Sequence, residues 1–363
     1  MYETKFMQLA LQLAKTAKGQ TAPNPAVGAV IVKNGEIVGV GTHLKAGEAH
    51  AEIHAINMAG KNAEGATLYV TLEPCSHYGK TPPCVEKIIE ANIKRVIVGT
   101  LDPNPYVAGK GIQKLKNAGI DVLVGVCESE AKEINQDFFH YITTKRPFVT
   151  LKTAMTIDGK IATASGESKW ITGDESRRDV HRYRHIHDAI LVGVGTVLKD
   201  NPKLTTRLPE GGKHPIRIIL DSHLRIPQDA FVIHDDSAPT WVVTNRHCNQ
   251  KQKKLELQRF EHVKVIEMDD LRNLHQLLDI LGQRGITSLF VEGGAKVNNS
   301  FLQAKLIDQF LFYIAPKIFG GSDAPTSFEG KGIERLKDAF ELNIESVEKL
   351  GNDLKIVAKP IRS

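Results

Sequence analysis

Two stretches decide how the first half of this chain is interpreted: HAEIHA at residues 50–55 and EPCSHYGKTPPC at residues 73–84. His50, Cys75 and Cys84 offer the imidazole and thiolate ligands that tetrahedral zinc prefers, and three protein ligands leave the fourth position open for water. Zinc lowers the pKa of water to about 7, which makes a nucleophile available at neutral pH. Glu52, two residues after His50, does not share its helix face and is a poor fellow ligand. It can instead carry the protons of that water, so the spacing predicts a catalytic zinc site.

The H-x-E…P-C…C order of these residues is typical of zinc deaminases, which hydrolyse an exocyclic amine from a heterocycle. The chain departs from that signature because eight residues, 76–83, separate the two cysteines instead of two. A disulfide between the cysteines is one alternative, but it would leave His50 and Glu52 without a role. A structural zinc site is another, with His54 or His77 as its fourth ligand. The other two cysteines, Cys127 and Cys248, have no ligand-type neighbours and are expected to be ordinary apolar residues.

Length and composition limit the class of protein. At 363 residues, the chain is expected to form two domains. No apolar run is long enough to span a membrane, and the N-terminus has no signal-peptide pattern. Four scattered cysteines fit reduced thiols and a cytoplasmic location. The net charge of +5 is too small to argue for a nucleic-acid partner.

Hydrophobic periodicity predicts a layered α/β domain in the first half, with a mixed sheet that is parallel after its first hairpin. Asn34-Gly35 is a strong hairpin signal between the first two strands. His50 and Cys84 each begin a helix at the end of a loop, where ligands gather at the edge of such sheets. The expected helices are Glu3–Ala17, His50–Ala59, Cys84–Ala91 and Gly111–Asn117, and the expected strands are Val27–Val32, Glu36–Gly41, Thr67–Thr71, Arg95–Val98 and Val122–Val126.

Several further motifs give the first half a specific resemblance. PNPAVG at 23–28, the two stretches quoted above, DPNP at 102–105 and GKG at 109–111 resemble the deaminase half of the bifunctional riboflavin-biosynthesis deaminase–reductase family. The long insertion between the cysteines is that family's form of the motif. The resemblance implies a cytidine-deaminase-like three-layer domain, zinc on His50, Cys75 and Cys84, and Glu52 as the proton donor. Asn24, His77 and Lys80 are plausible substrate contacts, and each could equally be a turn or surface residue.

A polar stretch at 143–147 ends in Pro147, and a strand-like run, Phe148–Leu151, follows it. We therefore expect one domain over residues 1–145 and a second over 146–363. RPFVTLKTAM at 146–155 and DGKIA at 158–162 resemble the opening of the reductase half of the same family. That resemblance implies a dihydrofolate-reductase-like fold that uses NADPH.

The second half lacks a G-x-G-x-x-G fingerprint, but two glycine segments follow apolar strands. They are Val192–Thr196 and the turn at Glu292-Gly293-Gly294, which leads into an expected helix, Lys296–Leu302. Glycine permits close backbone approach and a helix N-terminus attracts anions, although a tight turn alone would have the same sequence. Between these segments, Thr172-x-x-Glu175 predicts a capping box for a basic helix whose charges would mostly face solvent.

The resemblance also implies roles for residues of the second half. Arg184 and Arg207 match positions that hold the substrate's ribose phosphate, for which arginine is well suited. Lys152 and Asp200 are candidate polar partners in the reduction. The implied substrate site consists of Ser168, Arg184, Leu204, Arg207 and Glu292. The implied NADP contacts are Ala154, Trp170, Thr196, Asp200, Ser222, Gly294, Ala295, Lys296, Val297, Asn298, Asn299 and Ser300.

The reaction that these expectations describe has two steps. The first unit would remove the 2-amino group of 2,5-diamino-6-ribosylamino-4(3H)-pyrimidinone 5′-phosphate. The second would reduce the ribosyl chain of 5-amino-6-(5-phosphoribosylamino)uracil to ribityl. The partners expected are these small pyrimidine ribose phosphates, with no nucleic acid and no membrane, and a second copy of the chain in a homo-oligomer (dimer or tetramer). The alternatives are a nucleoside or tRNA-base deaminase with an accessory domain, and a zinc-stabilised nucleotide-binding module without catalysis.

Overall fold

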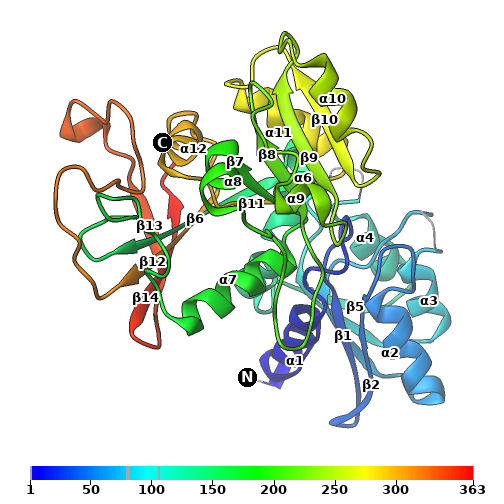
Figure 1. Cartoon of the computed structure of the whole chain (residues 1–363). Coiled ribbons are helices and arrows are strands. Elements are labelled where there is room, and N and C mark those ends of the chain that lie inside the picture. Colours follow the sequence, from blue (N-terminus) through cyan, green and yellow to red (C-terminus); the bar gives the residue numbers. More distant parts are fainter. Residues whose placement is uncertain (1, 79–81, 105–106, 363) are drawn as a thin grey trace. The chain divides into compact units, whose positions relative to one another are not determined.

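A computed structural model describes residues 2–78, 82–104 and 107–362. Lys80 and Pro105, which belong to motifs named above, lie outside these ranges. The chain divides into two compact units, Met1–Lys145 and Arg146–Ser363. Figure 1 shows the elements of both units.

The first unit is built on a five-stranded sheet. Its strands lie in the order β2-β1-β3-β4-β5, with β1 antiparallel to both β2 and β3 and the last three strands parallel. This is the mixed sheet that the periodicity predicted. Its elements are α1 (Tyr2–Thr16), β1 (Gly28–Lys33), β2 (Glu36–Thr42), α2 (Ala51–Ala59), a 3-10 turn η1 (Gly60–Ala63), β3 (Thr67–Leu72), α3 (Cys84–Glu90), β4 (Arg95–Thr100), α4 (Lys110–Asn117), β5 (Asp121–Val124), α5 (Glu128–Ile134) and α6 (Gln136–Thr144).

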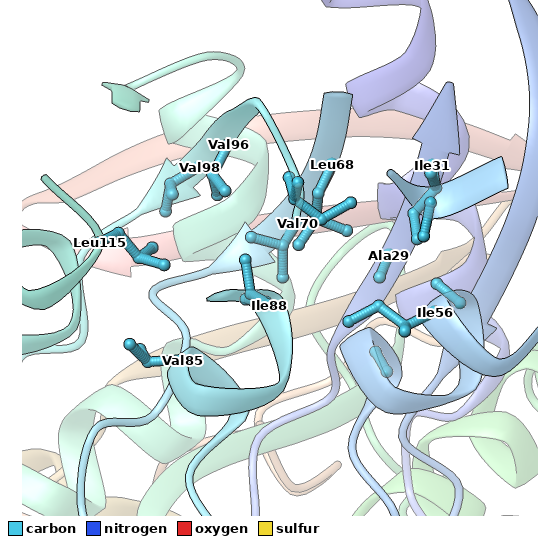
Figure 2. Packing of buried hydrophobic residues seen from close by; sticks show 14 of the residues in the cluster. Ala29, Ile31, Ile56, Leu68, Val70, Val85, Ile88, Val96, Val98 and Leu115 are labelled. Atoms are coloured by element: carbon cyan, nitrogen blue, oxygen red, sulfur yellow. The ribbon is translucent and has the colours of Figure 1, made fainter. Parts of the chain in front are cut away.

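Alternating side chains of the strands separate two cores in this unit. Ala29, Ile31 and Val70 point to the face covered by α2, α3 and α4, as Figure 2 shows for the residues around Ile56 and Ile88. Val30 and Tyr69 point to the opposite face, which α1 and α5 cover. Since strand side chains alternate between faces, burial of both sets produces three layers. The three-layer fold expected for the first half is confirmed.

Helix α2 can approach the sheet closely because β2 presents glycine to it. A Cβ added at Gly39 would lie 2.2 Å from the carbonyl oxygen of Ala55, and one at Gly41 would lie 2.1 Å from that of Ala51. Neither distance is compatible with a side chain. The two glycines therefore set the position of the helix whose first turn carries Glu52.

The second unit contains a nine-stranded sheet in the order β10-β9-β8-β7-β11-β6-β12-β14-β13. All neighbours from β10 to β12 are parallel, and β14 pairs antiparallel with both β12 and β13. Its elements are β6 (Phe148–Thr156), α7 (Asp174–Ile186), β7 (Ala189–Gly193), α8 (Val194–Asp200), β8 (Ile216–Leu220), α9 (Phe231–His234), β9 (Thr240–Asn245), α10 (Lys251–Leu257), β10 (Val263–Met268), α11 (Leu274–Gln283), β11 (Ser288–Val291), α12 (Ala295–Gln303), β12 (Gln309–Ala315), a 3-10 turn η2 (Leu336–Asp338), β13 (Leu342–Leu350) and β14 (Asp353–Pro360).

Helices cover both faces of the parallel part of this sheet. Side chains of α11 and α12, such as Leu277 and Phe301, pack on one face with Leu191 and Leu289. Helices α7 to α10 pack on the other face, around Ile190 and its neighbours. Each core cluster draws its residues from one unit only. No helix among the described residues is both long and apolar enough to cross a bilayer.

The start of α7 differs from the prediction. The helix begins at Asp174 after Gly173 as N-cap, and no side chain caps it, so the capping box expected from Thr172 and Glu175 is wrong. The Gly173 N–H and the Ser176 hydroxyl donate instead to the carboxylate of Asp353, at 2.7 and 2.6 Å. A contact from distant β14 therefore replaces the local cap.

Candidate zinc centre and reductase site

His50, Cys75 and Cys84 lie together in the first unit, with their ligand atoms all within 4.8 Å of one another. Nδ1 of His50 is 3.2 Å from Sγ of Cys84 and 3.6 Å from Sγ of Cys75. For tetrahedral zinc with ordinary Zn–S and Zn–N bonds, the nitrogen–sulfur separation is about 3.6 Å. The donor set and its spacing therefore fit zinc. Among the described residues, no fourth side chain belongs to the group, so neither His54 nor His77 completes a closed structural site.

Local structure explains why these three residues converge. His50 is the extended N-cap residue of α2, and Cys84 is the first residue of α3 after Pro83. Cys75 follows the end of β3, and the Cys84 N–H donates to its sulfur at 3.3 Å. The prediction that His50 and Cys84 each begin a helix is confirmed.

The two thiols differ in their pKa values. Hydrogen bonds from the Cys84 thiol and from His50 lower the pKa of Cys75 to about 4, whereas the same thiol–thiol bond and burial raise the pKa of Cys84. The lowered pKa of Cys75 favours metal binding, because only deprotonated cysteine is a ligand. All four cysteines are free, so the disulfide alternative does not hold.

Glu52 lies beside this cluster without belonging to it. Its side chain is buried, with 3 % exposed, and it interacts with the Cys84 thiol. Burial raises the pKa of the Glu52 carboxyl to about 7, and the neighbouring Cys75 charge adds to that effect. A carboxyl with its pKa near neutrality can both accept and return a proton, as general acid–base catalysis requires.

Two further residues support this site, and the sequence predicted a role for neither of them. Buried His43 stands edge-on to His50, with ring centroids 5.1 Å apart. One of its ring nitrogens contacts the Ala49 carbonyl and the other contacts Nδ2 of Asn24, both at 3.1 Å. This contact orients Asn24, one of the predicted substrate contacts. The only sequence signal for the role of His43 was its position directly after the second hairpin strand.

Glu73 is the second of these residues. Its buried carboxylate accepts the backbone N–H groups of Gly111 at 2.9 Å, Gly109 at 3.0 Å, Asp102 at 3.3 Å and Ile112 at 3.4 Å. The carboxylate thus fixes the loop before α4 relative to the Cys75 segment. The only sequence signal for Glu73 was its position directly before Pro74-Cys75.

In the second unit, predicted cofactor residues follow the carboxyl ends of neighbouring parallel strands. Thr196 follows β7, Ser222 follows β8 and Gly294 follows β11. A Cβ on Gly193 would lie 3.0 Å from Val297, so the end of β7 lies close to the first turn of α12. This edge is where parallel α/β sheets bind ligands.

The start of α12 fits a phosphate group. Gly294 is its extended N-cap, no side chain caps the helix, and a Cβ on Gly294 would meet nothing within 4 Å. The first N–H groups of the helix are therefore accessible to an anion such as the phosphate of a nicotinamide dinucleotide. The other cofactor candidates are more dispersed: Trp170 is 62 % exposed and lies under the Arg177 guanidinium, and Ala154 lies within β6.

Arg184, Glu292 and Lys152 form a half-buried ion-pair cluster at the same edge. Nε and Nη2 of Arg184 donate to the two carboxylate oxygens of Glu292 at 2.6 and 3.1 Å. Nζ of Lys152 lies 3.5 Å from Oε2 of Glu292. Nη1 of Arg184 donates to the Thr205 carbonyl at 3.1 Å. Burial alone would raise the pKa of Glu292, but the charges of Arg184 and Lys152 lower it to about 2.

The remaining candidates lie on nearby loops. Ser168 is half-buried, Arg207 is exposed, and Leu204 is buried with a positive φ of 54°. Most charges of α7 were expected to face solvent, which is wrong for His181 and His185, because both contact the loop 204–213. Arg184, for which a functional role was expected, contacts the same loop.

Comparisons with known proteins agree with this description of two units. A family model described as the cytidine and deoxycytidylate deaminase zinc-binding region matches residues 2–100, and one described as the RibD C-terminal domain matches residues 147–356. The chain is 49 % identical over 358 residues to the riboflavin biosynthesis protein RibD of Bacillus amyloliquefaciens, covering 99 % of this chain and 96 % of that one. It is 50 % identical to that of Aquifex aeolicus, covering 98 % of each.

Solved structures give the same result. A diaminohydroxyphosphoribosylaminopyrimidine deaminase/5-amino-6-(5-phosphoribosylamino)uracil reductase from Thermotoga maritima superposes with a TM-score of 0.88 at 41 % identity, over 99 % of both chains. Acinetobacter baumannii RibD superposes with a TM-score of 0.89 at 39 % identity over the same share.

Proposed function

This chain belongs to the bifunctional riboflavin-biosynthesis deaminase–reductase family, and on that premise we propose which substrates and residues its two units use. It is an enzyme with a zinc-dependent deaminase unit and a nicotinamide-dependent reductase unit of the dihydrofolate-reductase-like class. The substrates, the assignment of NADPH and the role of each residue are the proposal.

We propose that the first unit hydrolyses the 2-amino group of 2,5-diamino-6-ribosylamino-4(3H)-pyrimidinone 5′-phosphate. The observation that carries this is the convergence of His50, Cys75 and Cys84 beside buried Glu52. Zinc, when bound, supplies Lewis-acid activation of water at neutral pH. Glu52 accepts a proton from the attacking water and returns it to the leaving amine. We assign Asn24 to contact with the substrate ring, and its contact with His43, which orients its side chain, supports that role.

The second unit then reduces the ribosyl chain of 5-amino-6-(5-phosphoribosylamino)uracil to ribityl. NADPH, when bound, supplies the hydride. The turn before α12 holds its phosphates, together with residues after β7 and β8. Arg207 and Arg184 bind the substrate phosphate. Since Glu292 and Thr205 already engage three of the five Arg184 N–H groups, two remain for substrate. Glu292 holds the Lys152 ammonium at the same edge.

Mass spectrometry of the products tests the two proposed reactions. The diaminopyrimidinone phosphate is incubated with the full-length enzyme, with and without NADPH. Without NADPH the product should be the aminouracil with its ribosyl chain intact, and with NADPH it should be two mass units heavier as the ribityl compound. Unchanged substrate in both reactions of zinc-loaded enzyme would contradict the proposal.

We further propose a cytoplasmic location and a homo-oligomer. Four free cysteines, two of them in a site that needs thiolates, support a reducing compartment. Edge strand β13 exposes Ile344 and Val347, at 59 % and 57 %, which supports association through that edge. Light scattering on the eluted peak of a sizing column should give a dimer or tetramer, and a monomer at micromolar concentration would contradict it.

A further inference from the structure

One face of α7 contacts a loop that connects α8 to β8. His181, Arg184 and His185 are spaced at i, i+3 and i+4, so they share one side of the helix, and Asp188 follows two residues after the helix ends. Arg184 donates to the Thr205 carbonyl, and the Lys213 ammonium donates to Asp188 at 3.0 Å. Both ends of the loop, which spans residues 204–213, are thus attached to this side of the helix.

The two histidines on this face act as acceptors. The Arg207 N–H donates to Nδ1 of His181 at 3.2 Å, and the Lys213 N–H donates to Nδ1 of His185 at 2.9 Å. A backbone N–H can only donate, so each Nδ1 must carry a lone pair and each ring must be neutral with its proton on Nε2. Burial, followed by the charges of Arg184 and Arg207, lowers the pKa of His181 to about 4. Burial is the main cause that lowers the pKa of His185, and the positive charge of Lys213 lowers it further.

The loop itself is shaped for this contact. Leu204, Thr205 and Thr206 are buried, and the Thr206 hydroxyl donates to the Lys213 carbonyl at 2.7 Å, which closes the loop on itself. Gly212 has a φ of +148°, and a Cβ there would lie 2.9 Å from Nδ1 of His185. Only glycine permits the backbone to approach the imidazole this closely. The tip of the loop carries exposed Arg207.

We propose that His181 and His185 are positioning residues that fasten the loop 204–213 to α7 and thereby hold Arg207 at the substrate phosphate. This inference rests on the proposed role of Arg207. Neither histidine touches the reacting atoms. Because His181 binds the backbone N–H of Arg207 itself, it fixes the point from which the guanidinium extends. An arginine held in place loses less conformational freedom on binding, which lowers KM for a phosphorylated substrate.

The variants follow from the geometry. His181→Leu removes the acceptor, whereas His181→Asn places an amide oxygen near the position of Nδ1. Arg207→Ala and the double variant His181→Leu/Arg207→Ala test whether the histidine acts through the arginine. Exposed His247 in the same unit provides the matched control, His247→Leu. Each full-length enzyme is assayed by NADPH oxidation with the phosphorylated aminouracil and with the same compound lacking its phosphate.

Loss of one hydrogen bond corresponds to roughly a three- to tenfold effect. We expect His181→Leu to raise KM for the phosphorylated compound by about that factor, with kcat and the KM of the dephosphorylated compound unchanged. His181→Asn should restore KM, His247→Leu should have no effect, and His181→Leu should add nothing to Arg207→Ala. Amide hydrogen exchange at Arg207 should accelerate in His181→Leu and at Lys213 in His185→Leu.

Three results would overturn the inference: an unchanged KM in His181→Leu, an equal rise in KM for both compounds, or full additivity with Arg207→Ala. If Arg207→Ala itself leaves KM for the phosphorylated compound unchanged, the phosphate assignment fails and the inference fails with it. The Arg207→Ala variant alone tests the phosphate assignment, and the histidine variants do not affect that result. A failure of the proposed function is thus distinguished from a failure of this inference.

Discussion

At the scale of single residues, the deaminase site has three zinc ligands and, beside them, Glu52, for which we propose the proton-transfer role. Cys75→Ser or His50→Ala should lower bound zinc and abolish deamination, since each removes a ligand. Glu52→Gln should keep zinc, because Glu52 is outside the ligand group, and lose roughly 10²–10⁴-fold in rate. Zinc content by elemental analysis and ammonia release are measured on the same preparations. Full deaminase activity in zinc-loaded Glu52→Gln would contradict its role.

The Glu292 cluster gives a pH-dependent prediction at the same scale. The pKa of Glu292 is lowered from its ordinary value of 4.5 to about 2 in the folded protein. Stability from a lowered carboxyl pKa is present above the unfolded pKa and is lost as pH falls toward the folded one. The denaturation midpoint of the reductase unit should therefore fall between pH 4.5 and 2 more steeply in the native chain than in Glu292→Gln. Parallel curves for the two proteins would show that Arg184 and Lys152 do not stabilise the charged carboxylate.

At the scale of elements, the position of α2 against β2 controls the metal site. Gly41→Ala would place a Cβ 2.1 Å from the carbonyl oxygen of Ala51, so α2 must move. Ala51 lies between His50 and Glu52 in the sequence, so this movement would displace both residues. Such overpacking costs about 1–3 kcal/mol. We expect a lower melting temperature of the first unit, faster zinc loss to a chelator and weaker deamination, with NADPH oxidation unchanged. Gly195→Ala in α8, where a Cβ meets nothing within 4 Å, is the control for the effect on deamination. Equal zinc retention in native chain and Gly41→Ala would contradict the close-packing argument.

The same scale shows what sequence could and could not predict. The β1–β2 hairpin was predictable because Asn34 and Gly35 both adopt positive φ, which is a local property. The zinc ligands were predictable because a short motif encodes their chemistry and spacing. The start of α7 was not, because Asp353, 180 residues after Gly173, supplies the contact that replaces a cap. The roles of Glu73 and His181 were not predictable for the same reason. Their hydrogen-bond partners are backbone N–H groups that only the tertiary fold brings close to them.

At the scale of the whole molecule, the two units have separate hydrophobic cores. The clusters of the first unit contain residues from Phe6 to Phe139, and those of the second contain residues from Val149 to Ala358. The zinc ligands lie entirely in the first unit, and the Arg184–Glu292–Lys152 cluster lies entirely in the second. A domain that has its own core and its own site can fold and act alone.

We therefore expect fragments 1–145 and 146–363 to retain one activity each. The first should bind zinc and release ammonia from the diaminopyrimidinone phosphate, and the second should oxidise NADPH with supplied aminouracil phosphate. Both rates should stay within about tenfold of the full chain, since the mutual stabilisation lost by separating two domains is small relative to their cores. Circular dichroism and a cooperative melt establish that each fragment is folded before activity is compared. An equimolar mixture of the two fragments serves as the control for any benefit from association. If both fragments are folded and the first holds zinc, yet neither is active, each site must depend on residues of the other unit, and the assignment of one complete site to each unit is wrong.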